Sequence, residues 1–197
     1  MENSKEKISH AALRLFLKDS YKEVSIRDIL NEVGLTKGTF YHYYESKEEL
    51  FEEVTKHFYN NTVIADYSKF PKSSLKEFYE YYLNLETLQK PSELDGDMNL
   101  FTFLSEAFKR VPDFLELYIA QQKKEIWAWA EIIEVAKKNK EIRTNIKNEE
   151  LAAIFLGIND GVFWVNHAVM GKLDIKSIEI VKRDWNNLYE LLKTNKK

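Results

Sequence analysis

The sequence predicts an all-α protein of about nine helices, in which a three-helix helix-turn-helix unit precedes a larger helical region. Three observations predict this fold class. Six Gly and three Pro in 197 residues cannot supply the turns that a β-sandwich or barrel needs roughly every 8–12 residues. Apolar residues recur at helical spacing along most of the chain. Ser, Thr and Asn stand where these helical patterns begin, as helix caps do.

The first two predicted helices are short and amphipathic. The first begins at a candidate cap, Ser4, and ends near residue 19. The second follows Ser25, which forms an imperfect capping box with Asp28, and it ends at Gly34, a residue suited to the position after a helix. Their apolar stripes are Ile8, Ala12, Leu15 and Phe16, and then Ile26, Ile29, Leu30 and Val33.

The third and fourth predicted helices follow closely. Thr36 is a candidate cap for a helix over residues 37–44, which is barely two turns long. Ser46 and Glu49 form a full capping box that opens a fourth helix reaching about residue 65. Two short helices joined by a tight turn around Gly34 make a helix-turn-helix.

The third helix carries an unusual set of outward residues. At 100° per residue, Phe40 and Tyr44 fall on the inner side, where they would close a small core. The opposite side has hydroxyls, an imidazole and a glycine in place of the usual Glu and Lys: Gly38, Thr39, Tyr41 and His42. Such groups can bond base edges or phosphates and allow a close backbone approach, and a helix N-terminus suits phosphate. The face therefore favours a DNA major groove, and a self-packed mini-bundle with exposed polar residues is the alternative.

The segment from Thr36 to Tyr44, followed by Ser46 to Leu50, resembles the recognition helix and the next turn of the TetR family of bacterial transcriptional regulators. The resemblance runs from about Ile8 to Phe58. It implies a dimer that binds a near-palindromic operator in double-stranded DNA, most often as a repressor. Carried over by position, the implied DNA-binding residues are Ser25, Arg27, Thr36, Lys37, Gly38, Thr39, Tyr41, His42, Tyr43 and Lys47. Lys47 would hold a phosphate at the start of the fourth helix.

Charge limits how this unit would bind DNA. The net charge of the whole chain is −3, and residues 1–50 hold eight Lys and Arg against nine Asp and Glu, a net charge of −1. Affinity must therefore come from local placement of cations and from pairing two copies. We expect residues 1–47 to form the helix-turn-helix DNA-binding domain and residues 48–197 a helical effector-binding and dimerisation domain.

The rest of the chain predicts five more helices. They cover about residues 73–90, 98–110, 112–139, 148–170 and 175–193, with Pro112 in the first turn of the third of them. The last two carry heptad-like apolar stripes that could pair with their copies as a four-helix bundle. From the pattern alone, an intrachain core is an equal alternative, and the family resemblance favours a homodimer. The predicted interface residues are Ile158, Val162, Val165, Val169, Val181, Trp185, Leu188 and Leu192.

The family resemblance also implies a small-molecule effector. The 27 Phe, Trp and Tyr residues suggest a hydrophobic or aromatic one, although most of these rings must be core. The predicted lining residues are Tyr82, Phe101, Phe108, Gln122, Trp129 and Phe163. Asp160 and His167 lie two turns apart on one helix face, too far for a direct dyad. Either His167 is a bonded interior or interface histidine, or Asp160 or His167 is a polar fixture of a ligand cavity.

Other functional classes lack their motifs. Cys is absent, so a thiol nucleophile, a disulfide scaffold and a Cys-type zinc site are excluded. The four His stand in no metal-binding frame, and no phosphate-binding glycine motif occurs. We expect no catalytic residue, metal or cofactor.

The sequence also predicts a compartment, and it leaves one alternative function open. The N-terminus lacks the apolar segment of a secretory signal, and the longest apolar run, Leu151 to Ile158, is far below the roughly 18 residues that span a membrane. We expect a cytoplasmic protein without membrane binding. A helical ligand-carrier or interaction protein with a vestigial helix-turn-helix is the alternative function.

Overall fold

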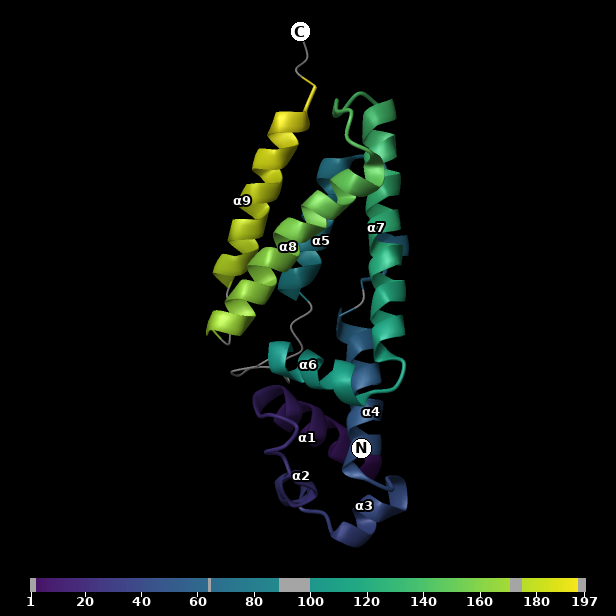
Figure 1. Cartoon of the computed structure of the whole chain (residues 1–197), viewed down its shortest axis with the longest axis vertical. Coiled ribbons are helices and arrows are strands. Elements are labelled where there is room, and N and C mark those ends of the chain that lie inside the picture. Colours follow the sequence, from purple (N-terminus) through teal and green to yellow (C-terminus); the bar gives the residue numbers. More distant parts are fainter. Residues whose placement is uncertain (1–2, 64, 89–99, 171–174, 195–197) are drawn as a thin grey trace. The chain divides into compact units, whose positions relative to one another are not determined.

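The computed structural model describes residues 3–63, 65–88, 100–170 and 175–194. Within these ranges it contains nine α-helices and no β-strand, so the predicted all-α class is confirmed (Figure 1). A π-helical turn, Tyr59–Val63, follows the fourth helix. The helices are α1 (Ser4–Lys18), α2 (Ile26–Val33), α3 (Lys37–Tyr43), α4 (Lys47–Phe58), α5 (Leu75–Leu88), α6 (Leu100–Arg110), α7 (Phe114–Lys138), α8 (Asn148–Met170) and α9 (Ile175–Leu192).

Three of the predicted caps hold the helix-turn-helix together. The side-chain oxygens of Ser25, Thr36 and Ser46 each accept a hydrogen bond from the backbone N–H three residues further on. Each bond satisfies one of the N–H groups that a helix N-terminus leaves unpaired. The starts of α2, α3 and α4 are therefore fixed by local sequence.

Two helix starts differ from the prediction. Asn3, rather than Ser4, caps α1, because its side chain accepts the N–H of Glu6 while the Glu6 carboxylate accepts the N–H of Asn3. Pro112 lies before α7 and not in its first turn. Asp113 has a left-handed φ of 57°, which separates the proline from the helix that begins at Phe114.

The chain divides into two compact units. The first comprises Met1–Ile64 and Pro91–Leu117, and the second comprises Ala65–Lys90 and Tyr118–Lys197. Helices α1 to α4 and α6 therefore lie in the first unit. Helices α5, α8 and α9 and most of α7 lie in the second. These compact units are not the predicted functional domains, residues 1–47 and 48–197, and that functional division stays a prediction.

The core of the first unit is aromatic and includes α6. The ring of Phe51 on α4 packs against Phe16, Tyr21 and Phe103, with ring centres 4.9 to 5.5 Å apart. Phe58, seven residues further along α4, also packs against Phe103 edge to face. Helix α6 therefore closes the core of the unit that carries the helix-turn-helix.

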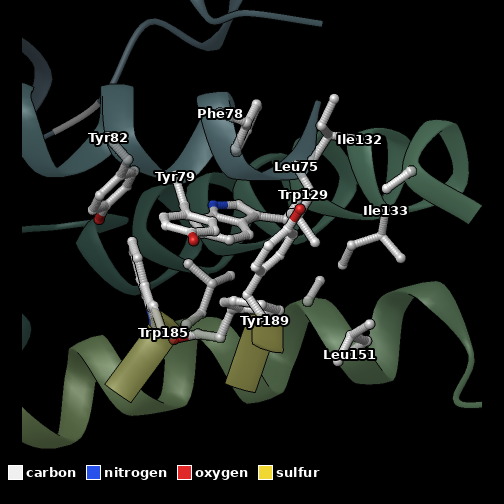
Figure 2. Packing of buried hydrophobic residues seen from close by; sticks show 14 of the residues in the cluster. Leu75, Phe78, Tyr79, Tyr82, Trp129, Ile132, Ile133, Leu151, Trp185 and Tyr189 are labelled. Atoms are coloured by element: carbon white, nitrogen blue, oxygen red, sulfur yellow. Dashed lines mark hydrogen bonds between the residues drawn. The ribbon is translucent and has the colours of Figure 1, made fainter. Parts of the chain in front are cut away.

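The core of the second unit is a cluster of rings from α5, α7, α8 and α9 (Figure 2). Trp129 and Trp185 have no exposed surface, and their ring centres lie 4.9 Å apart. Phe155 stacks on Trp129 at 5.4 Å, and Tyr79 and Tyr82 contact Trp185 edge to face. Burial of such large rings supplies most of the hydrophobic stabilisation of this unit.

A carboxylate ties the second unit together at one end. Glu141, which follows α7, accepts hydrogen bonds from the backbone N–H groups of Leu75 and Lys76 and from the hydroxyls of Ser74 and Tyr189. A negative charge at a helix N-terminus is stabilising. Glu141 therefore caps α5 and joins it to α9.

Candidate nucleic-acid interface

The turn between α2 and α3 is built around one glycine. Gly34 has a φ of +66°, the left-handed conformation that other residues adopt at a cost. Its N–H and that of Leu35 both donate to the carbonyl of Leu30, which ends α2. The chain then passes through Thr36 directly into α3, so the predicted helix-turn-helix is present.

Helix α3 is fixed from its inner side. Phe40 and Tyr44 are completely buried, as predicted. The Tyr44 hydroxyl donates to the Glu53 carboxylate at 2.8 Å and shares a 2.7 Å hydrogen bond with the Ser9 hydroxyl. Burial raises the pKa of Tyr44, so this hydroxyl keeps its proton. These contacts hold the end of α3 on α1 and α4.

The outer side of α3 presents the predicted residues to solvent. Tyr41 is 58% exposed, and Lys37, Gly38 and His42 are exposed as well. Tyr43 is half-buried, and its ring meets the imidazole of His42 at 4.8 Å. Hydroxyl, imidazole and ammonium groups on one short helix can bond base edges and phosphates.

Two outer hydroxyls are engaged with each other. The oxygens Oγ1 of Thr36 and Thr39 lie 3.1 Å apart, and Thr36 also accepts the N–H of Thr39 as its cap. Ser25 likewise bonds Asp28 in the cap of α2. These three side chains therefore have a structural role, and a contact with DNA would be additional to it.

Gly38 has no structural reason to be glycine. A Cβ at this position would meet only Thr36 Oγ1 at 3.8 Å, an ordinary contact, and no positive φ requires glycine there. Glycine inside a helix costs about 1 kcal/mol relative to alanine. A missing side chain on the outer face leaves room for something outside the protein to approach the backbone.

Two exposed cations flank this face. Arg27, in the first turn of α2, and Lys37, in the first turn of α3, are exposed. Neither has an ion pair or side-chain hydrogen bond to the part of the chain that the structure describes. Both are free to meet a phosphate.

Lys47 begins α4 and bonds groups of its own chain. Its ammonium donates to the carbonyls of Tyr21 at 2.8 Å and Val24 at 2.9 Å, and it lies 4.1 Å from the centre of the Tyr21 ring. Desolvation by burial lowers its pKa. The ammonium therefore bonds two carbonyls of the α1–α2 connection, a structural role that the sequence did not predict. The phosphate contact of Lys47 stays a prediction and would be additional to these bonds.

The predicted effector residues are divided between the units. Phe101 and Phe108 lie in the first unit and are partly exposed, whereas the other four lie in the second. Trp129 has no exposed surface, so it borders no water-sized space and belongs to the core; this prediction is corrected. The lining role of the remaining residues, Tyr82, Phe101, Phe108, Gln122 and Phe163, stays a prediction.

The predicted dimer residues are also divided. Val181, Trp185 and Leu192 are buried in the core of their own chain, so they are corrected to intrachain core. Three others are half-buried against that core: Ile158, Val162 and Leu188. Val165 is 59% exposed, and the side chain of Val169 lies outside the described residues.

A different stripe of α8 faces outward. It consists of Ile154, Gly157, Gly161 and Val165, all exposed. A Cβ built on either glycine would have nothing within 4 Å. Over residues 177–192 of α9, whose side chains the structure describes, the exposed residues are polar apart from Leu191. The outward apolar surface of these two helices therefore belongs to α8.

Asp160 on α8 is a carboxylate whose pKa burial alone shifts. It is half-buried, and it has no ion pair or hydrogen bond with a residue that the structure describes. Burial raises its pKa. Burial, and then the charge of Asp160, raise the pKa of Tyr118 on α7. The side chain of His167 lies outside the described residues, so its predicted role stays a prediction.

The described residues hold neither a metal-binding cluster nor a membrane-spanning helix. Nowhere in the described ranges do three His, Asp or Glu side chains gather in a metal-binding group. None of the described helices combines the length and apolar character needed to cross a membrane.

Comparison with known proteins agrees with this geometry. Residues 8–54 match the model of the family described as bacterial regulatory proteins, tetR family. An uncharacterised HTH-type transcriptional regulator of Lactococcus lactis is 37% identical over 89 residues, which are 41% of this chain and 44% of that protein. The HTH-type transcriptional repressor KstR2 of Mycolicibacterium smegmatis is 32% identical over 54 residues, 27% of this chain and 26% of the relative. The chain thus matches less than half the length of these curated relatives.

Solved structures resemble the fold over nearly the whole chain. A transcriptional regulator from Saccharomonospora viridis, solved in complex with choline, superposes with a TM-score of 0.70 at 18% identity and covers 95% of both chains. The reduced form of Escherichia coli NemR superposes with a TM-score of 0.66 at 15% identity and covers 98% of both. At such identities the likeness concerns the fold alone.

Proposed function

We propose that this chain, which belongs to the TetR family of bacterial regulatory proteins, represses transcription by binding a near-palindromic DNA operator as a dimer. Membership makes it a transcriptional regulator of the TetR type. Repression, dimeric binding and release by an effector are our proposals. They rest on the two outward surfaces described above, the outer face of α3 and the apolar stripe of α8.

The observation that carries DNA binding is the outer face of α3. Gly38 leaves the backbone open beside the exposed Tyr41 and His42, and no contact with the described residues requires a glycine there. In a major groove, these side chains would contact base edges while Arg27 and Lys37 neutralise phosphates on either side. The N-terminus of α3 adds N–H groups that suit a phosphate.

The dimer that we propose uses the outward stripe of α8. Ile154 and Val165 would supply apolar contact, and Gly157 and Gly161 between them would let the helix of a second copy approach closely. Two-fold pairing of this kind is isologous, so one stripe meets itself. Dimers of helix-turn-helix proteins read half-sites about 34–36 Å apart, which is the spacing we expect for the operator.

A small molecule would control this dimer. We propose that a hydrophobic or aromatic effector binds in the second unit near Asp160, whose carboxylate is costly to bury and whose charge raises the pKa of Tyr118. A differential binding energy of about 1–3 kcal/mol between DNA-competent and incompetent arrangements suffices to release the operator. The choline complex of the Saccharomonospora viridis regulator makes an organic cation a reasonable first ligand to test.

Selection from fragmented genomic DNA tests the proposal. Purified protein should enrich a few fragments that share a near-palindrome, and a gel shift should then show saturable binding. The Tyr41→Ala variant should lose this binding while its melting temperature stays unchanged, because the ring is outward. Failure of the wild type to enrich any sequence would instead support the helical ligand-carrier with a vestigial helix-turn-helix.

A further inference from the structure

Two cationic side chains lie close to the aromatic ring of Tyr21. Tyr21 lies in the connection between α1 and α2 and is buried. The ammonium nitrogen of Lys47 and the guanidinium carbon of Arg110 each lie 4.1 Å from the ring centre. A cation within about 6 Å of an aromatic ring is attracted by it, and more strongly where water is excluded.

Arg110 comes from a distant part of the sequence. It ends α6, well beyond residues 8–54 that match the family. Its Nε donates to the Glu106 carboxylate at 2.5 Å, which fixes the guanidinium, and Lys109 pairs with the same carboxylate at 3.5 Å. Helix α6 belongs to the same compact unit as the helix-turn-helix, and Phe103 holds it on α4.

The connection that Tyr21 belongs to determines where α2 begins. It is a tight turn in which the N–H groups of Glu23 and Val24 donate to the Ser20 carbonyl. The next residue, Ser25, caps α2, and Arg27 lies in the first turn of that helix. A displacement of Tyr21 would therefore move the cation that we assign to a phosphate.

We propose that Arg110 is a positioning residue for DNA binding, which acts by clamping the Tyr21 ring and so fixing the start of α2. This inference rests on the proposed function. The competing explanation is direct contact between Arg110 and a phosphate, since its side chain keeps 30% of its surface exposed. The two explanations differ in salt dependence, because only a phosphate contact releases counterions.

The test compares Arg110→Met with Lys109→Met. Both variants remove one positive charge from the same helical turn and one partner of Glu106, but only Arg110 lies over the ring. Arg110→Met should weaken operator binding about 3- to 10-fold, the scale of a cation–π contact in each protomer. The slope of log affinity against log salt should not change. Arg110→Lys should restore most of the affinity, and Lys109→Met should bind like the wild type.

Hydrogen exchange in the free protein gives a second measurement that needs no DNA. Amides of residues 20–25 should exchange faster in Arg110→Met than in Lys109→Met, while those of α8 and α9 should be equal in both. In a Tyr21→Leu background, Arg110→Met should have no further effect on either measurement.

Three possible results would overturn either the inference about Arg110 or the proposed function. If Arg110→Met behaves like Lys109→Met in both measurements, the inference is wrong. If the salt slope falls by about 0.9 per protomer, Arg110 is a phosphate contact and the inference is wrong as well. If the wild type selects no DNA at all, the proposed function fails, and this is seen before any Arg110 variant is compared.

Discussion

The indole N–H of Trp185 on α9 donates a 2.7 Å hydrogen bond to the backbone carbonyl of Phe155, in the middle of α8. Both side chains are completely buried. The bond therefore lies in a dry environment, where an unpaired N–H or carbonyl is costly. It fixes the position of α9 along α8 and directs Trp185 into its own chain (Figure 2).

Replacing Trp185 by Phe should destabilise the second unit. The variant loses the hydrogen bond and leaves a void beside Trp129, so we expect the free energy of unfolding to fall by about 2–3 kcal/mol. Urea denaturation followed by circular dichroism measures this change. Trp127→Phe is the matched control, because Trp127 is 66% exposed and should have almost no effect. Equal stabilities of the two variants would contradict the packing.

Gly38→Ala should change stability and DNA affinity in opposite directions. Alanine gains up to about 1 kcal/mol of helix propensity, and its Cβ meets no obstacle inside the protein. The melting temperature should therefore rise slightly. The methyl group would face the DNA backbone or bases, so operator affinity should fall at least about tenfold, which corresponds to roughly 1.4 kcal/mol. A variant that is more stable and binds DNA as well as the wild type would remove Gly38 from the interface.

The parts of the fold that the sequence predicted well depend on neighbours within a few residues. The caps at Ser25, Thr36 and Ser46 bond an N–H three residues away, and Gly34 is needed by the local φ. Such features are readable without knowing the tertiary structure. The inner and outer sides of α3 followed for the same reason, because a short amphipathic helix has one apolar side to bury.

The errors concern contacts between segments far apart in the sequence. The apolar stripe of α9 indicates burial, but periodicity does not say whether a partner chain or the same chain covers it, and Trp185 is covered by α8 of its own chain. The internal bonds of Lys47 were not predicted, because its partners, the carbonyls of Tyr21 and Val24, depend on how the turn folds. No sequence pattern indicated the contact of Arg110 with the Tyr21 ring, because the two residues lie in different segments of the chain.

Lys37 and Lys47 should respond differently to salt. Lys37→Ala should remove one phosphate contact in each protomer, so the slope of log affinity against log salt should become shallower by about 0.9 per protomer. Lys47→Ala should leave that slope unchanged and lower the melting temperature, because its ammonium bonds two backbone carbonyls. Affinity titrations at several salt concentrations measure both. A shallower slope for Lys47→Ala would instead support the predicted phosphate contact of Lys47.

Asp160→Asn should stabilise the protein at neutral pH. Burial raises the pKa of Asp160 above its ordinary value of 3.8, so the folded state binds this proton more tightly than the unfolded state does. Stability from this group is therefore fully present below pH 3.8 and is lost as the pH rises through the folded pKa. The Asn variant has no carboxyl group to ionise, so it does not lose this stability. Its gain in the free energy of unfolding over the wild type should be near zero at acidic pH and greatest at neutral pH.

Asp28→Asn is the control of opposite sign. Hydrogen bonds from Ser25 lower the pKa of Asp28, so its charged form stabilises the folded state above pH 3.8 and this stabilisation is lost on acidification. The same substitution should therefore destabilise at neutral pH. Thermal melts of both variants between acidic and neutral pH give the comparison. Two curves of the same sign would contradict the assigned environment of Asp160.

The outward stripe of α8 predicts which substitutions break the dimer without unfolding the chain. Val165→Glu places a charge on a residue that is exposed in the single chain, so the protomer should fold normally. At a dimer interface the same charge would be buried without a partner, in both copies, at a cost of several kcal/mol. The variant should sediment as a monomer at micromolar concentration and bind operator weakly, because each monomer brings only one copy of α3.

Two further variants separate this stripe from the rest of the surface. Gly161→Leu adds a side chain where the single chain has open space, so it should keep the fold and still prevent close approach of a second α8. Leu191→Glu changes the most exposed apolar residue of α9, on a side that is otherwise polar, and it should stay dimeric. If Leu191→Glu gave monomers while Gly161→Leu and Val165→Glu remained dimeric, the interface would lie on α9, and the spacing of the two DNA-binding helices would have to be derived from that surface.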